Sequence, residues 1–186
     1  MKKIVTLILT ITFITSCNCN KKTKNSTEEK QVSTENTEEK EEILLGNISC
    51  KDLEQGIYNK WFIDNFNAHQ LDKTTLKEVK PLLKKVTIKI FMGTWCEDSQ
   101  REVPAFHKIM EHLDFPEKNY KIIAVSRDKK TPEGLEKGMD IQYVPTIIFY
   151  TNKKELGRIV ESPVESLEKD MLTILSGKTY KHTYQE

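Results

Sequence analysis

The sequence lacks an excess of charge of either sign, which restricts the partners it can have. Its 186 residues include 29 Lys and Arg against 28 Asp and Glu, a formal net charge of +1. Nucleic-acid binding relies on a basic excess that neutralises phosphates. Nucleic acids are therefore not expected as partners.

Metal ligands at a recognisable spacing are also missing. The four cysteines match no zinc pattern and are too sparse for a disulfide scaffold: Cys17, Cys19, Cys50 and Cys96. The histidines show no ligand spacing, and surface positions are expected for all four: His69, His107, His112 and His182. Neither a metal nor a cofactor is expected.

A hydrophobic run long enough to cross a membrane is absent. The apolar segment 4–14, interrupted only by threonines, has eleven residues and follows the basic start Met1-Lys2-Lys3. A helix of that length spans roughly 16 Å, about half of a bilayer core. The pattern predicts the hydrophobic region of a signal peptide and not a transmembrane helix.

The end of this run, Ile14-Thr15-Ser16-Cys17, resembles the lipobox of bacterial lipoproteins. The resemblance implies a signal peptide over residues 1–17 and a diacylglycerol group on Cys17. Each buried CH₂ of the acyl chains contributes ~0.8 kcal/mol to anchoring. The chain is then expected in the cell envelope, lipid-anchored and facing the periplasm, where disulfide chemistry is available. The alternative is an ordinary secretory signal cut nearby.

Residues 18–42 are predicted to form a disordered tether. Val32 is the only aliphatic residue among them, so the segment cannot bury enough apolar surface to offset the entropy of ordering its backbone. Cys19 lies in this tether and is expected to be free or incidental.

The remaining sequence predicts an α/β domain. An N-terminal helical extension is expected over 43–70, with an amphipathic helix over 52–66 whose apolar face comprises Leu53, Ile57, Trp61 and Phe62. A second short helix, capped by Thr74 or Thr75, opens a domain over 71–178, and 179–186 is a C-terminal tail. Strands are expected over 86–92, 120–125, 146–150 and 156–161, and helices over 97–113 and 164–175. This alternation predicts a central mixed β-sheet flanked by helices and covered on both faces.

One motif carries chemistry. A buried strand runs into Trp95-Cys96-Glu97-Asp98-Ser99, and a helix pattern starts at once. This resembles the Trp-Cys-x-x-Cys motif of the thioredoxin family, and Pro104, the Val144-Pro145-Thr146 segment and the 153–158 hairpin match the family as well. The stretch is similar to thioredoxin-family proteins of flavobacterial type, which carry Gly-Thr-Trp-Cys-x-Asp-Ser. The resemblance covers about residues 71–178 and implies a thioredoxin-like fold.

Elementary electrostatics supports Cys96 as a nucleophile. A thiol at a helix N-terminus faces unpaired N–H groups and the positive end of the helix dipole, which favours thiolate. Glu97 and Asp98 oppose this effect by like charge, and Arg101 offsets them in part. The alternative is a buried structural cysteine.

Two departures from the family pattern occur together. Ser99 stands where the family has its second cysteine, and Ile90 stands where it has a buried aspartate. No disulfide can close between Cys96 and Ser99, although the serine hydroxyl can donate a hydrogen bond to the thiolate. The combination predicts a monothiol design.

The resemblance also implies a client site. It predicts a cis bond before Pro145, so that the backbone of Val144 is presented beside Cys96, where an extended client can pair. Trp95 would form an apolar lip, or else only pack in the core. Cys50 is expected either as a buried small hydrophobe or as a resolving thiol.

Three functions agree with these features. The first is membrane-anchored thiol–disulfide exchange, as an oxidoreductase or isomerase acting through Cys96 on protein or small-molecule thiols and disulfides, with an external resolving thiol. The second is a non-catalytic thiol-capture or scaffold module. The third, an accessory role in cytochrome c maturation, rests on analogy of fold.

Overall fold

The structure is a computed structural model and describes residues 42–185. The expected signal peptide with Cys17, Cys19, and the tether up to residue 41 lie outside the described residues. Among the residues described, no helix combines the length and the apolar character needed to span a membrane.

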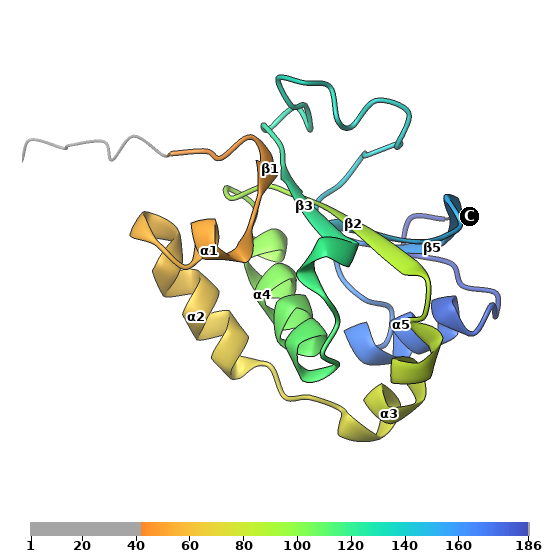
Figure 1. Ribbon diagram of the computed structural model, residues 1–186. Helices are drawn as coiled ribbons and strands as arrows, with labels where there is room; N and C mark the ends of the chain where they lie inside the picture. The colour runs from red at the N-terminus through yellow and green to blue at the C-terminus, as the bar shows by residue number, and fades with distance from the viewer. Residues whose placement is uncertain (1–41, 186) are drawn as a thin grey trace, which may run out of the picture. The chain divides into compact units, whose positions relative to one another are not determined.

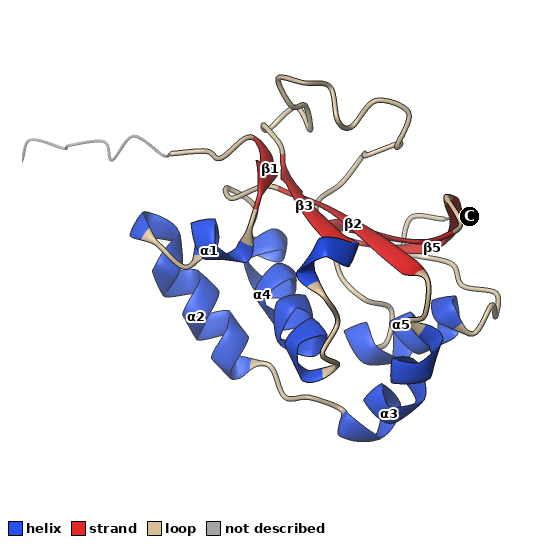
Figure 2. Ribbon diagram, viewed as in Figure 1, coloured by secondary structure: helices blue, strands red, loops and turns tan. Residues whose placement is uncertain are grey.

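Five strands form one mixed sheet, which confirms the predicted fold class (Figures 1 and 2). The strands are β1 (Gly46–Ile48), β2 (Val86–Met92), β3 (Tyr120–Ala124), β4 (Thr146–Thr151) and β5 (Lys154–Val160). Their order in the sheet is β1-β3-β2-β4-β5. Only the β2–β3 pair is parallel, and the other three pairs are antiparallel.

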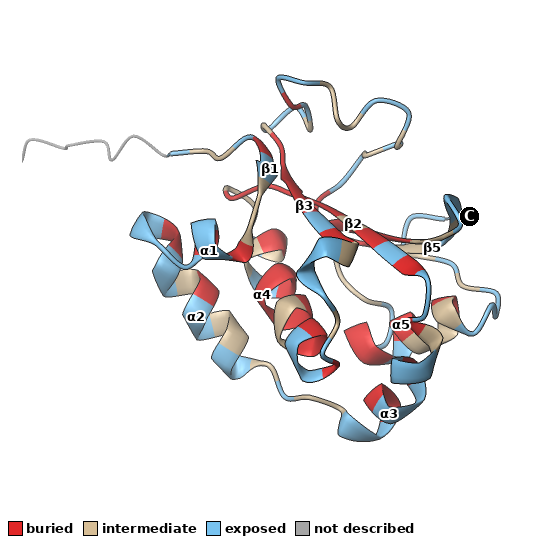
Figure 3. Ribbon diagram, in the orientation of Figure 1, coloured by how far each residue is buried: buried red, intermediate tan, exposed pale blue. Residues whose placement is uncertain are grey.

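The helices gather on one face of this sheet (Figure 2). They are α1 (Cys50–Leu53), α2 (Asn59–Ala68), α3 (Lys73–Leu82), α4 (Glu97–His112) and α5 (Leu167–Leu175), with 3₁₀ turns at Gly56–Tyr58 and Glu117–Asn119. Every one of the five helices contributes side chains to a single core cluster that also holds Ile88, Ile90 and Met92 of β2. Figure 3 shows buried positions along both α4 and α5.

The opposite face of the sheet is covered by a long irregular segment, 126–145. Leu135, Met139 and Ile141 of this segment pack against a second apolar cluster on that face. Because side chains alternate along a strand, Phe91 belongs to this second cluster while its neighbours Ile90 and Met92 belong to the first. Both faces are covered, as predicted, but one of them without a helix.

The prediction of one helix over 52–66 was wrong. The helix is interrupted after Leu53, and Gly56 adopts a φ of 56°, a conformation that favours glycine. The break turns Ile57 away from the core, so that 61% of it is exposed, whereas Phe62 is buried. The segment expected as an extension also supplies β1, whose Gly46 pairs with Ala124.

The cap of α3 was also misassigned. Asp72, and not Thr74 or Thr75, caps this helix, because its carboxylate accepts the backbone N–H groups of both threonines at 3.1 Å.

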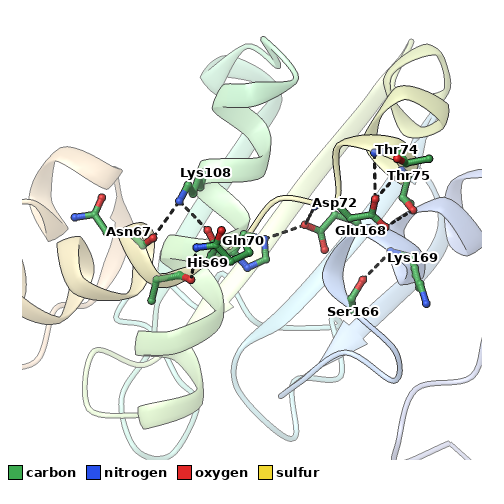
Figure 4. A network of polar contacts seen from close by, with 11 residues as sticks. Asn67, His69, Gln70, Asp72, Thr74, Thr75, Lys108, Ser166, Glu168 and Lys169 are labelled. Carbon is green, nitrogen blue, oxygen red and sulfur yellow. Dashed lines mark hydrogen bonds and ion pairs between the residues drawn. The ribbon is translucent and has the colours of Figure 1, made fainter.

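A partly buried hydrogen bond between two side chains fixes the connection between α2 and α3 (Figure 4). His69 Nε2 lies 2.9 Å from Glu168 Oε1, and the backbone N–H of Asp72 donates to the same oxygen at 3.2 Å. Lys108 of α4 donates to the His69 carbonyl at 2.7 Å. These contacts, called the His69–Glu168 clasp below, join the α2–α3 connection to α4 and α5.

Candidate active site

The reactive thiol predicted from the sequence lies where strand β2 turns into helix α4. Cys96 is the N-cap of α4, with extended backbone angles (φ −101°, ψ 121°). Its N–H donates to the Gly93 carbonyl at 3.0 Å, and its own carbonyl accepts the N–H of Gln100 at 2.9 Å. The side chain of Gln100 donates to the Thr94 carbonyl at 2.7 Å, which holds the turn against the first turn of the helix.

The thiol meets the loop that precedes β4. Cys96 Sγ donates to the carbonyl of Val144 at 3.0 Å, across 48 residues of sequence. The Val144–Pro145 peptide bond is cis, as the resemblance implied. Cys96 is half-buried and packs at the margin of the second apolar cluster, whereas Val144 and Pro145 are buried. The structure therefore brings these three residues together and leaves the sulfur partly open to solvent.

Ser99 has a structural partner. Its side chain is fully buried, and its hydroxyl accepts the N–H of Gly93 at 3.2 Å. The hydrogen bond to the Cys96 thiolate that the sequence suggested is not among the contacts of the described residues, so that role of Ser99 stays a prediction.

Strand β2, which leads into the turn that carries Cys96, contains no carboxylate side chain. Ile90 is 1% exposed and pairs with Ile122 on one side and Ile147 on the other. This part of the strand is therefore apolar core and offers no proton acceptor.

Trp95 is positioned by three kinds of contact. Its indole N–H donates to the carbonyl of Val125 at 2.9 Å, and its ring covers Gly93 so closely that a Cβ there would lie 2.5 Å from Cε2. The guanidinium of Arg127 lies 5.1 Å from the ring centroid, and Lys129 Nζ lies 5.9 Å from it. The ring is half-buried, so it both packs in the turn and presents a surface beside Cys96.

The charges at the start of α4 pair with one another. Arg101 donates to Asp98 and to Glu102, each at 2.7 Å. Burial raises the pKa of Glu102, and the Arg101 guanidinium opposes that shift. Arg101 therefore pairs with Asp98, as the sequence suggested, and with Glu102, whereas its expected effect on Glu97 stays a prediction.

Cys50 lies far from this turn. It is 2% exposed, and burial raises the pKa of its thiol to about 12, although its hydrogen bond with Tyr120 acts in the opposite direction. Tyr120 pairs with Ile88 near the start of β2, whereas Cys96 follows the end of that strand. The structure thus agrees with the buried alternative for Cys50 and places the two thiols at opposite ends of the parallel strands.

Sequence reasoning missed an aromatic pair beside the site. The rings of Tyr143 and Tyr184 stack at 4.1 Å with an interplanar angle of 14°. A pocket of about 440 Å³ lies next to them and is also lined by Asp140, Arg158 and His182. No signal in the sequence relates residue 184 to residue 143, because the tail carries no periodic pattern.

Metal ligands do not converge in the described part of the chain. Over residues 42–185, no group of three or more His, Cys, Asp or Glu side chains is arranged to hold a metal ion.

The comparison with known families agrees with this geometry. The family model described as Thioredoxin (Thioredoxin_9) matches residues 51–173, which is more than half of the chain. The chain belongs to the thioredoxin family. The match starts upstream of the 71–178 range on which the motif resemblance rested, within the segment that supplies α1.

Two solved structures share the fold of this thioredoxin-family chain. A protein of unknown function from Pseudomonas aeruginosa is 15% identical, with a TM-score of 0.54 over 71% of this chain and 93% of that one. An HIV epitope-scaffold protein is 14% identical, with a TM-score of 0.53 over 73% of this chain and 95% of that one. No protein with curated annotation matches the sequence.

Proposed function

We propose that this thioredoxin-family protein exchanges thiols with client disulfides through Cys96 as its single nucleophile. The observation that carries the proposal is the half-buried sulfur at the N-terminus of α4, 3.0 Å from the backbone carbonyl before the cis-proline. A sulfur in this position is reachable by a client and faces the free N–H groups of a helix start.

The reaction has two exchange steps. The Cys96 thiolate, having lost its proton to solvent, attacks one sulfur of a client disulfide, forms an S–S bond with it and releases the other sulfur as a thiolate. An external thiolate then attacks the client sulfur of this mixed disulfide, forms a new S–S bond and returns the Cys96 thiolate. No net oxidation or reduction of the protein occurs over the cycle.

The need for an external thiol follows from what surrounds Cys96. Ser99 has no sulfur, and the buried position of Cys50 at the far end of the strands keeps that thiol from the mixed disulfide. Within residues 42–185 no second thiol can reach the mixed disulfide, so the proposal assigns release of the client to a second molecule.

A turnover assay with a glutathionylated peptide tests the proposal. We expect catalysed reduction when glutathione is present and only a stoichiometric adduct when it is omitted. Cys96→Ala should abolish both, and the matched variant Cys50→Ala should change neither. An adduct without turnover at any glutathione concentration would favour the thiol-capture module instead of the enzyme.

The lipobox resemblance adds a location to this proposal. We propose that a lipid on Cys17 holds the domain at the surface of a membrane in the cell envelope, facing the periplasm, where client disulfides form. Protein and small-molecule thiols and disulfides are the partners that this compartment would supply.

A further inference from the structure

The last described residues fold back across the domain and end beside the cis-proline. Tyr180 donates its hydroxyl to Asp170 of α5 at 2.8 Å. Four residues further along the chain, the Tyr184 hydroxyl bonds to the carboxylate of Glu161, and its ring stacks on Tyr143. Residues 179–185, called the C-terminal strap below, are therefore held at both ends.

The tip of the strap lies next to the reactive turn. Tyr143 directly precedes Val144, whose carbonyl accepts the thiol of Cys96 at 3.0 Å. Glu161, the partner of Tyr184, donates its backbone N–H to the Pro145 carbonyl at 2.8 Å. The hydrogen bond to Glu161 raises the pKa of Tyr184 to about 12, and the charge of Asp98, two residues after Cys96, adds to this shift.

The stacked rings leave apolar surface exposed at this place. Tyr143 is 40% exposed and Tyr184 is 45% exposed, both well above the half-buried residues around Cys96. Exposed aromatic faces beside a nucleophile offer contact area for an aromatic or aliphatic side chain.

The separation of a client residue from the reacting client cysteine determines whether that residue can reach the Tyr143–Tyr184 pair. A client whose sulfur meets Cys96 runs extended past Val144, and an extended chain advances ~3.3–3.6 Å per residue. Since Tyr143 is the residue immediately before Val144 in the loop, the client residues within two positions of the client cysteine lie within reach of the pair.

We propose that Tyr143 and Tyr184 form an aromatic platform that selects clients carrying an aromatic side chain within two residues of the reacting cysteine. This inference rests on the proposed exchange function and names the class of client. The C-terminal strap is then a part of the client site, because it supplies one of the two rings.

Symmetric peptide disulfides test this proposal on the full chain. The probes are the disulfide-linked dimers of Gly-Phe-Cys-Phe-Gly and Gly-Ala-Cys-Ala-Gly, and the readout is the rate at which intact-mass spectrometry detects the mixed disulfide on Cys96. We expect the wild type to react ~2–10-fold faster with the Phe peptide, the preference that one aromatic pair contributes. Tyr184→Ala and Tyr143→Ala should reduce this preference to less than about twofold, and Tyr184→Phe, which keeps the ring, should retain most of it. The alkylation rate of Cys96 by iodoacetamide, which has no side chain to place, should be the same in all four proteins.

Three results would overturn the inference. A preference for the Phe peptide that survives in Tyr184→Ala would remove the platform from the client site. If Tyr184→Ala formed the mixed disulfide faster than the wild type, and by the same factor with both peptides, the C-terminal strap would act as a lid and not as a selective contact. If neither peptide forms an adduct with the wild type while iodoacetamide still labels Cys96, the exchange function itself fails, and the inference fails with it.

Discussion

In the proposed mechanism, Ser99 determines how a client leaves the protein. Its side chain is fully buried at the start of α4 and accepts the N–H of Gly93 at 3.2 Å. A thiol in the same place would sit one helical turn from Cys96, close enough to attack a mixed disulfide within the same molecule. The single serine therefore separates a protein that waits for an external thiol from one that releases its own client.

Ser99→Cys should convert the protein to intramolecular release. We expect the Cys96 mixed disulfide to decay more than about tenfold faster without added thiol, since the new sulfur is held beside it. Intact-mass spectrometry of a preformed adduct measures the decay. The control, Ser99→Ala, should leave the adduct long-lived, although it costs about 1–3 kcal/mol of stability because the Gly93 N–H loses its acceptor. An adduct in Ser99→Cys that persists as long as in the wild type would refute the expected geometry.

Cys50 should make the fold sensitive to alkaline pH. Burial raises the pKa of its thiol from 9.0 to about 12 in the folded protein. Below pH 9.0 both states keep the proton, so the contribution to stability is complete there. As the pH rises towards 12, the unfolded chain gives up a proton that the folded chain retains, and stability falls by up to ~1.4 kcal/mol per pH unit.

Urea unfolding at about pH 8 and about pH 10 measures this loss. The wild type should lose more stability between the two values than Cys50→Ala does, because the variant lacks the titrating thiol. Tyr180, whose pKa is also raised by burial, titrates in both proteins and cancels in the comparison, whereas Tyr120 adds to the difference because Cys50 is one of the causes that raise its pKa. Identical losses in the two proteins would show that the thiol titrates alike in the folded and unfolded states.

At the scale of elements, the His69–Glu168 clasp joins the α2–α3 connection to α5 (Figure 4). Burial alone would raise the pKa of Glu168, but hydrogen bonds from His69 and from backbone N–H groups outweigh it and lower the pKa below its usual 4.5. A carboxylate with a lowered pKa stabilises the fold above its unfolded value, and this stabilisation is lost as the pH falls through the folded value.

Glu168→Gln should therefore flatten the loss of stability under acid. The variant removes the titrating carboxylate while keeping the side-chain shape, so its free energy of unfolding should change less between neutral pH and about pH 3 than that of the wild type. At neutral pH we expect a cost of about 1–3 kcal/mol, since the charge-assisted bond to His69 is weakened. Lys169→Ala, which removes an ammonium paired with the exposed Glu165, should change stability by less than about 0.5 kcal/mol. Parallel acid profiles for the wild type and Glu168→Gln would contradict the role of the carboxylate.

The elements with strong periodicity could be predicted from the sequence. Strand β2 has the predicted bounds, Val86–Met92, and α4 ends one residue before the predicted end. Strand β1 was missed because three residues carry too little pattern, and its place is fixed only by pairing with β3. The prediction of one helix over 52–66 was wrong because the apolar spacing of the sequence continues through Gly56, whereas the helical backbone is interrupted there.

In the same way, part of the candidate site could be predicted from the sequence and part could not. Cys96 and the loop at Val144 could be predicted because local motifs carry them, and the structure brings them to 3.0 Å. The stack of Tyr143 on Tyr184 could not, because it depends on the path of the strap around α5 and the edge strand β5. A contact that follows from tertiary path alone leaves no periodicity in the sequence.

At the scale of the whole molecule, the proposal joins a lipid anchor to a domain that needs an external thiol. Cys17→Ala should remove the acylation site and shift the protein from the membrane fraction to the soluble fraction, because no other acyl chain would hold it. Fractionation of cells fed a labelled fatty acid measures both effects. Cys19→Ala, two residues away, should stay labelled and membrane-bound, and an unlabelled wild type would exclude the anchor.

The central claim is that one sulfur, on Cys96, carries the covalent chemistry of this thioredoxin-family chain. Peptide mapping by mass spectrometry, after the full chain is mixed with oxidised glutathione, tests this claim most directly. Within the domain, the account predicts a glutathione on the peptide that contains Cys96, removed by excess reduced glutathione, and none on the peptide that contains Cys50. An adduct mapped to Cys50, or a Cys96 that remains unmodified while the protein is folded, would contradict it.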